Sequence, residues 1–386
     1  MAGTYITEEI EKAISELEEK LRQHPQRRLD LAWQAIREDK PRRYPVIYLG
    51  RLVDISAGEG RITQDFSPDQ EENLLRKLKS LTGPLKLFNP IAPVISTGVG
   101  PGTLSASFGL AVDASTGYVP KRTISLEKAL KKGMPDPEKS GFLPAIKEEI
   151  EAVKALTPEW VKIGLPDTQG PFNLCHLITG EEVFTAPYTM PEKFQEFITL
   201  VTEFFQQANL KVRNWIGRER LAEREMETIH IAECSVNLVS SKFYCQYLLP
   251  YDLQVAKKWK YVDIHTCSGM HVFSATLNSI PNLVATEAGY IERACAGWTP
   301  VETALSQIGE RPIALRIGEE LPSDFQEAEN YIKKRLLLAR KNNRLFFAFT
   351  GMYWKKTDEP AIQQLHLSLD EFWEKEILPF SYEKTS

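Results

Sequence analysis

Residues 228–286 read TIHIAECSVNLVSSKFYCQYLLPYDLQVAKKWKYVDIHTCSGMHVFSATLNSIPNLVAT and contain the pattern that decides the fold. Short runs rich in β-branched and apolar residues at Thr228–Glu233, Val262–Thr266 and Leu283–Thr286 are typical of buried strands. The segment Ser241–Trp259, between the first two runs, has helical periodicity. A strand, a helix and a second strand in this order predict a right-handed crossover between parallel strands of one sheet.

The same alternation extends along the rest of the chain. Five further candidate strands are Tyr44–Leu49, Ala92–Thr97, Trp160–Leu165, Ile313–Ile317 and Leu345–Thr350. Further helical segments are Leu143–Leu156, Pro191–Asn209, Pro300–Ile308 and Asp324–Lys341. Eight such units are the number at which a parallel sheet closes, so we predict an α/β fold, a (β/α)8 TIM barrel. An open doubly wound sheet is the alternative, but no GxGxxG motif follows the first strand, so its dinucleotide-binding version has no support.

The length of 386 residues allows two or three average domains, although α/β barrels run past about 250 residues as one unit. We predict an N-terminal helical extension over residues 1–40 and one barrel over residues 41–380. The acidic amphipathic start, MAGTYITEEIEKAISELEEK, belongs to the extension. Residues 98–141 are too many for an ordinary loop after a strand, so we expect a lid or an inserted subdomain there.

Composition and charge limit the possible partners. Lys and Arg number 47 against 52 Asp and Glu, and no basic block occurs, which argues against a dedicated binder of nucleic acid or anionic membranes. No apolar run approaches the roughly 20 residues of a membrane span, and the start has no signal-peptide pattern. Five cysteines, an odd number spread over a long chain, suit a reducing compartment. We therefore expect a cytoplasmic protein with a small-molecule substrate.

The sharpest candidate for chemistry is the run DIHTCSG at residues 263–269. At the end of a strand, residues i and i+2 share a face, so His265 and Cys267 can reach one metal ion, as in a zinc site. One His-x-Cys pair is half of a site. In a barrel, the active site lies at the carboxyl ends of the strands, which adds Arg51, Asp167, Gln169, Glu233 and Glu287 as candidates.

At this point the chain resembles the uroporphyrinogen decarboxylase superfamily, which includes the zinc-dependent corrinoid methyltransferases. The resemblance runs from RRLDLAWQAIREDKPRRYPVIYLGR through ISTGVGPGTLSASFG, PDTQGPFNLCHLITGEE and SSKFYCQYLLPYDLQVAKKW to HTCSG. HTCSG is similar to the family's HxCG signature, which supplies two zinc ligands in the methyltransferase branch. The resemblance implies a zinc ion that activates a thiol, and a methyl group carried on a separate corrinoid protein.

One departure concerns the third zinc ligand. The methyltransferases place a further Cys at the end of the last strand, where this chain has Thr350 and Gly351. A catalytic zinc site needs about three protein ligands, so the third has to come from elsewhere, such as Glu233, Cys234 or Glu287. In this interpretation Asp167 and Glu287 orient the substrate or supply a ligand.

The remaining candidates concern the substrate and the mouth of the barrel. Arg51 and Gln169 are candidate substrate-binding residues, and Tyr353 and Trp354 follow the final strand and exclude water. In the decarboxylase branch, an Arg-rich segment binds the carboxylates of a porphyrinogen without any cofactor. A porphyrinogen carboxy-lyase in which Arg51 and its neighbours serve that role is the second hypothesis. A non-catalytic barrel that binds a tetrapyrrole is the third.

Overall fold

The computed structural model describes residues 2–38, 45–49, 69–113, 119–267, 269–288, 300–322, 324–340, 344–350 and 358–381. The strands are β1 (Val46–Leu49), β2 (Val94–Ser96), β3 (Val112–Asp113), β4 (Val119–Pro120), β5 (Lys162–Gly164), β6 (Thr228–Ala232), β7 (Tyr261–His265), β8 (Leu283–Ala288), β9 (Ala314–Glu320) and β10 (Leu345–Thr350). All eight strands predicted from the apolar runs are present, with ends that differ by a few residues.

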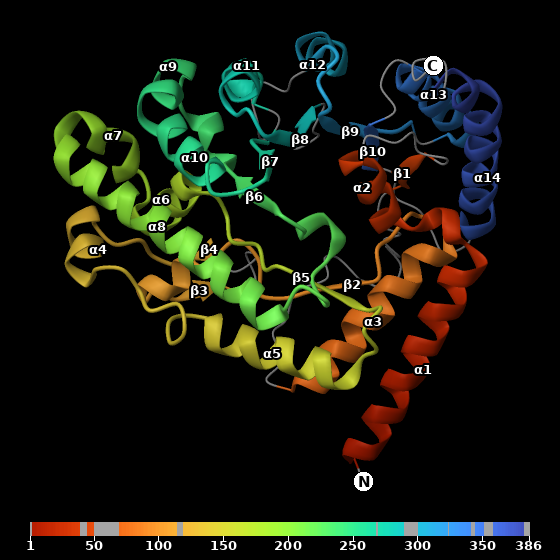
Figure 1. Cartoon of the computed structure of the whole chain (residues 1–386), viewed down its shortest axis with the longest axis horizontal. Coiled ribbons are helices and arrows are strands. Elements are labelled where there is room, and N and C mark those ends of the chain that lie inside the picture. Colours follow the sequence, from red (N-terminus) through yellow and green to blue (C-terminus); the bar gives the residue numbers. More distant parts are fainter. Residues whose placement is uncertain are drawn as a thin grey trace.

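Most of the helices lie around the outside of the strands, whereas α2 (Leu29–Arg37) lies beside β1 and β10 (Figure 1). The helices are α1 (Ala2–Gln23), α2 (Leu29–Arg37), α3 (Gln70–Lys86), α4 (Leu126–Lys132), α5 (Leu143–Leu156), α6 (Pro171–Thr179), α7 (Glu182–Thr189), α8 (Pro191–Ile216), α9 (Ser241–Phe243), α10 (Leu249–Ala256), α11 (Met270–Ser279), α12 (Val301–Ile308), α13 (Phe325–Leu336), α14 (Glu359–Glu376) and α15 (Leu378–Ser381). The segment Ser241–Trp259, which has helical periodicity, is helical from Ser241 to Ala256, with a π-helical turn (Tyr244–Leu248) between α9 and α10. Among the described residues, no helix is both long and apolar enough to cross a bilayer.

Two groups of parallel strands form the centre of the fold. One is a six-stranded sheet in the order β1-β10-β9-β8-β7-β6, and the other is the pair β2-β5. In the part of the chain that the structure describes, no ladder joins β1 to β2 or β5 to β6. Single contacts span the second gap, where the Gly170 N–H donates to the Ala232 carbonyl at 2.7 Å. The α/β class is therefore confirmed, whereas the paired strands alone do not complete a closed ring.

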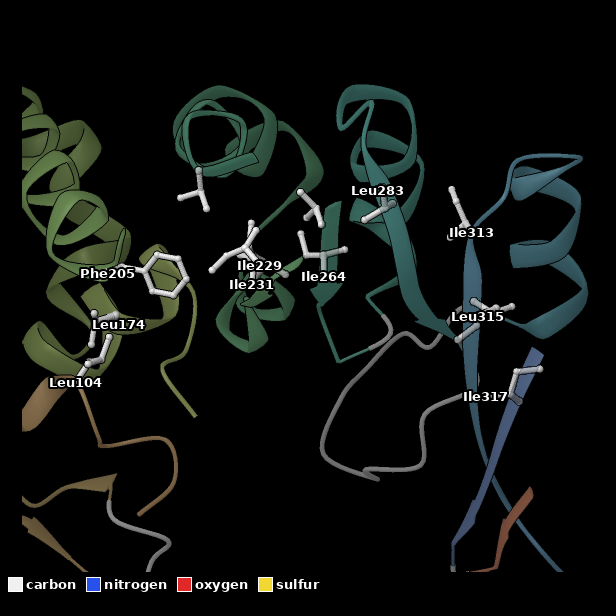
Figure 2. Packing of buried hydrophobic residues seen from close by; sticks show 14 of the residues in the cluster. Leu104, Leu174, Phe205, Ile229, Ile231, Ile264, Leu283, Ile313, Leu315 and Ile317 are labelled. Atoms are coloured by element: carbon white, nitrogen blue, oxygen red, sulfur yellow. The ribbon is translucent and has the colours of Figure 1, made fainter. Parts of the chain in front are cut away.

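Each strand of the larger sheet has an apolar outer face. Ile229 and Ile231 of β6 and Ile264 of β7 are fully buried among helices, together with Ile317 of β9 (Figure 2). Because side chains alternate along a strand, the residues between them face the other side of the sheet. On that inner side, Trp33 of α2 packs with Val46, Ala285, Ala314 and Phe346. The second helix of the predicted extension thus packs against the sheet itself.

Residues 98–141, where we expected a lid or an inserted subdomain, pack against the helices in the part that the structure describes. The described part contains a 3₁₀ turn (Ser105–Phe108), the antiparallel pair β3-β4 and helix α4. Leu104 and Phe108 are buried, and the ring of Phe108 meets that of Phe204 on α8 edge to face at 5.5 Å. Ser125 caps the first turn of α4 through the Lys128 N–H. The segment is therefore anchored to the helical layer through the main apolar core of the protein, to which Leu104 and Phe108 belong.

A buried polar network joins the two ends of the chain. Arg27, which follows α1, forms an ion pair with Asp370 of α14 and lies 3.5 Å from Nδ1 of the buried His366. Nε2 of His366 donates to Oδ1 of Asn89, which in turn accepts the N–H of Leu49 at the end of β1. Burial, together with the charge on Arg27, lowers the pKa of His366 well below its ordinary value, so this ring stays neutral.

We predict that Arg27→Met lowers the free energy of unfolding by about 3 kcal/mol, because Asp370 loses its partner in a largely buried environment. Urea denaturation followed by circular dichroism at pH 7.5 measures this. Arg22→Met is the control, since the Arg22 side chain is 67% exposed in its pairs with Glu18 and Glu19, and its cost should stay below about 0.5 kcal/mol. A cost below about 1 kcal/mol for Arg27→Met would show that the network adds little.

Candidate metal centre

Three potential metal ligands converge at the carboxyl ends of β6 and β7. The ligand atoms of Cys234, His265 and Cys267 all lie within 4.8 Å of one another. Nε2 of His265 is 3.2 Å from Sγ of Cys267. Two thiols and one imidazole at such distances form a donor set that suits zinc in a three-ligand catalytic site with a fourth position open.

The parallel pairing of β6 with β7 brings these residues together. Ala232 is opposite His265 in the ladder, and the Glu233 N–H donates to the His265 carbonyl at 2.7 Å, which continues the pairing by one residue. Cys234 then begins a 3₁₀ turn (Cys234–Leu238). Cys267 has a φ of +47°, in the left-handed region that non-glycine residues seldom adopt. The strand thus ends in a strained turn that holds the second thiol next to the imidazole.

Glu287, at the end of the neighbouring strand β8, orients His265. Its Oε2 lies 2.6 Å from Nδ1 of His265, and its Oε1 accepts the Thr266 N–H at 3.2 Å. Nδ1 is occupied in this way, so Nε2 is the nitrogen that faces the thiols. A carboxylate behind a histidine ligand fixes the tautomer and the ring orientation in metal sites. The structure thus places the predicted Glu287 behind the cluster rather than in it.

Local charges control the protonation of the two residues of the His-x-Cys pair. Burial lowers the pKa of His265, but Glu287 and Cys267 outweigh this effect and raise it to about 10. A hydrogen bond with Cys234 and burial raise the pKa of Cys267 above its ordinary value, while His265 acts in the opposite direction. Without a cation, both residues therefore keep their protons at neutral pH, and a bound metal ion would take the place of those protons.

Glu233, which we expected among the metal ligands, points elsewhere, and this expectation is corrected. Its two carboxylate oxygens accept the N–H groups of Phe172 and Asn173 at 2.9 and 2.8 Å. These are free N–H groups in the first turn of α6, where a carboxylate is favoured by the helix dipole. The third member of the described cluster is Cys234, the next residue along the chain.

Asp167 and Gln169 lie at the carboxyl end of β5. Oδ1 of the exposed Asp167 accepts the Gln169 N–H at 3.3 Å, which makes an Asx turn, and it also accepts the Gln169 side-chain amide. The side chain of Gln169 is in turn bonded to Asn173. Gln169 is 5% exposed and has a φ of +55°. Asp167 is therefore the more accessible of the two to a substrate.

Three expected site residues lie outside the described residues: Arg51, Tyr353 and Trp354. Thr350 ends β10, and Gly351 is also outside the described residues.

A charged group on the inner face of the sheet was not expected from the sequence. Oδ2 of Asp263, two residues before His265, accepts hydrogen bonds from Arg224 and Arg316, each at 2.7 Å, and lies 3.1 Å from Nδ1 of His230. Asp263 is 1% exposed, and these positive partners outweigh the burial that raises its pKa and hold it well below its ordinary value. The sequence did contain a sign of this group: residues i and i+2 of a strand share a face, so Asp263 lies on the same face of β7 as His265.

A second buried carboxyl group, Asp252 of α10, lies close enough to Glu233 to raise its pKa. For Glu233, burial is the larger cause of the raised pKa, and Asp252 is the next. Burial also raises the pKa of Asp252 to about 7, although a 2.8 Å hydrogen bond from the Tyr244 hydroxyl opposes the shift. The carboxylate that caps α6 thus has a second acidic group nearby in a dry environment.

Comparison with known proteins supports the fold. No protein-family model and no curated protein matches this chain. The structure is similar to that of a methyltransferase from Methanosarcina mazei, with a TM-score of 0.60 over 90% of this chain and 99% of the other. The two sequences are 15% identical, so the similarity establishes a shared α/β architecture and nothing beyond it.

We predict that Asp252→Asn reduces the loss of stability as the pH rises. The pKa of Asp252 is higher in the folded chain than the value near 4 of an unfolded chain. Its contribution to stability is therefore complete below about pH 4 and is lost as the pH rises through 7, at about 1.4 kcal/mol per pH unit. The amide keeps an acceptor for Tyr244 but has no proton to lose. Urea denaturation at half-unit steps from pH 5 to 8 measures the difference, and parallel curves for the two proteins would contradict the prediction.

Proposed function

We propose that this chain is a methyltransferase of the uroporphyrinogen decarboxylase superfamily that moves a methyl group between a corrinoid protein and a small acceptor or donor. The observation that carries the proposal is the convergence of Cys234, His265 and Cys267 within 4.8 Å. The similarity of the whole fold to a solved methyltransferase is consistent with it. The motif HTCSG, similar to the family's HxCG signature, provides two of the three residues.

The proposal includes a closed (β/α)8 barrel. The six-stranded sheet ends at β1 and β6, and the pair β2-β5 supplies the two strands needed to complete a ring in chain order. Between β5 and β6, the backbone of Ile163 bonds to the backbone of Arg220 and Ala222, which precede β6. Between β1 and β2, the side chain of Asn89, which precedes β2, bonds to the backbone of Leu49 at the end of β1. These contacts support a closed ring in which irregular backbone connects β5 to β6 and the Asn89 side chain connects β1 to β2.

The donor set fits a zinc ion held by Cys234, His265 and Cys267. Cys₂His with an open position is a known arrangement for catalytic zinc, and the contact of Glu287 with Nδ1 leaves Nε2 of His265 as the nitrogen that faces the ion. When bound, zinc lowers the pKa of a thiol substrate, so that the thiolate is available to accept a methyl group. Cys234 replaces the ligand that the family takes from its last strand.

The other residues act on the substrate and on water. In this proposal Asp167, which is exposed after β5, orients a substrate, and the side-chain amide of Gln169 donates to its carboxylate. We propose that Arg51 contributes to substrate binding and that Tyr353 and Trp354 exclude water. A separate protein would hold the corrinoid, which would supply the methyl group that the thiol substrate accepts.

We predict about one zinc ion per chain in protein purified without chelators, and its loss in His265→Ala, Cys267→Ser and Cys234→Ser, because each removes one of three ligands. Atomic emission analysis measures the metal. Cys245→Ser is the matched control, since Cys245 is exposed and lies outside the cluster, and it should retain the metal.

A metal-free wild type, or a Cys234→Ser protein with full zinc content, would contradict the proposed centre. Methylcobalamin, supplied with a series of small thiols, tests methyl transfer through the change in its visible spectrum. Release of carbon dioxide from uroporphyrinogen by metal-free protein would instead support the carboxy-lyase hypothesis. Binding of a tetrapyrrole without either reaction would support the non-catalytic barrel.

A further inference from the structure

Cys234 differs from the other two proposed ligands in how its backbone is held. His265 is the last residue of β7 and is paired in the ladder, and Glu287 binds both its ring and the Thr266 N–H that leads to Cys267. Cys234 lies beyond the end of β6 in a 3₁₀ turn. Apart from the backbone bond that the preceding residue, Glu233, makes to the His265 carbonyl, its position depends on side-chain contacts around that turn.

The first of these contacts ties the turn to helix α6. Oδ1 of Asn173 accepts the Ser235 N–H at 3.1 Å and also the Ser235 hydroxyl. On the other side of Cys234, Glu233 accepts the N–H groups of Asn173 and Phe172. Both neighbours of Cys234 are thus bonded to the first turn of α6. Asn173 is 7% exposed, so these bonds are shielded from water.

The second contact ties the turn to the loop that carries Cys267. Nδ2 of Asn237 donates to the carbonyl of Thr266 at 2.7 Å and to the carbonyl of Cys234 at 3.3 Å. One amide group therefore bridges the backbones on which the two thiols are mounted. The bridge joins Cys234 itself to Thr266, the residue before Cys267. It therefore limits how far the two sulfur atoms can separate.

Two glycines leave the room that these contacts need. A Cβ at Gly170 would lie 2.4 Å from Oε1 of Glu233, and a Cβ at Gly269 would lie 2.6 Å from Oδ1 of Asn237. Neither distance is possible between a real Cβ and an oxygen, so a side chain at either position would displace the contact. Gly269, the last residue of the HTCSG motif, thus leaves the space that the side chain of Asn237 occupies.

We propose that Asn173 and Asn237 are positioning residues that hold Cys234 in reach of His265 and Cys267. The inference rests on the proposed zinc centre, and it names the residues that keep Cys234, the third ligand, within reach of the ion. Neither asparagine is a member of the cluster of potential ligands. Partners of this kind, which orient ligands without touching the metal, typically change metal affinity by about 10-fold to 100-fold when removed.

The test uses the full chain, freed of metal, with Zn²⁺ alone in competition with a chromophoric chelator. Asn173→Ala and Asn237→Ala should each weaken zinc binding by about 10-fold to 100-fold. Co²⁺ in place of zinc gives a second measurement, because the near-ultraviolet thiolate-to-cobalt absorption scales with the number of bound thiolates. That absorption should fall towards half of the wild-type value as Cys234 drops out.

Two asparagines provide matched controls. Asn209, 1% exposed on α8, donates to the Phe205 carbonyl at 2.9 Å and matches the burial of Asn173. Asn282 bridges two backbone carbonyls, those of Ala256 and Trp259, at 3.0 and 2.8 Å, as Asn237 does, but lies just before β8, at the opposite end of the strands. Asn209→Ala and Asn282→Ala should lose comparable stability in urea while zinc affinity stays within about threefold of wild type.

The outcomes separate this inference from the proposed function. A wild type that binds neither Zn²⁺ nor Co²⁺ overturns the proposed centre and this inference with it. A wild type with a two-thiolate cobalt spectrum that Asn173→Ala and Asn237→Ala leave unchanged overturns the positioning role alone. Equal losses of zinc affinity in the control variants also overturn it, because they would reflect general destabilisation. If Asn173→Ala does not fold, the half-buried Asn237 variant decides the matter by the same measurements.

Discussion

The parallel pairing of β6 with β7 is the constraint on which the rest of the centre depends. The ladder ends where Ala232 meets His265, and one more hydrogen bond, from the Glu233 N–H to the His265 carbonyl, carries the pairing past the last strand residue. That bond fixes the residue before Cys234 beside the His-x-Cys pair, at the start of the turn that Asn173 and Asn237 bind. The glutamate that supplies the N–H uses its side chain to cap α6, so one residue fixes both the sheet edge and the helix behind it.

The sequence predicts some of the candidate centre and not the rest, for a physical reason. His265 and Cys267 could be found because their spacing and their place at the end of a strand are local properties. Whether Glu233 or Cys234 is the third ligand could not be predicted, because both residues follow β6 and their side chains point in different directions. Glu233 is directed away from the cluster by two helix N–H groups, those of Phe172 and Asn173, which lie some sixty residues earlier in the chain. The sequence around Glu233 contains no sign that these groups need an acceptor.

The fold follows the same division. Short runs of β-branched or apolar residues, such as Thr228–Ala232 and Leu345–Thr350, are sufficient to locate strands, because such runs are typical of strands buried on both faces. Closure is a different property, because it depends on how neighbouring strands meet. Between β5 and β6 the backbone around Leu221 bonds to Ile163, and no pattern of apolar residues distinguishes such a contact from a regular ladder.

The pairing of β1 with β10 has a consequence for synthesis of the chain. Val46 pairs with Phe346, so partners separated by 300 residues complete the six-stranded sheet. Loop closure over such a distance is slow, and during synthesis β1 has no partner until β10 has left the ribosome. During that interval Trp33 has no Phe346 to pack against, and Arg27 has no Asp370. The apolar side chains of α2 and β1 therefore lack their partners on β10 for as long as the residues between them are being made.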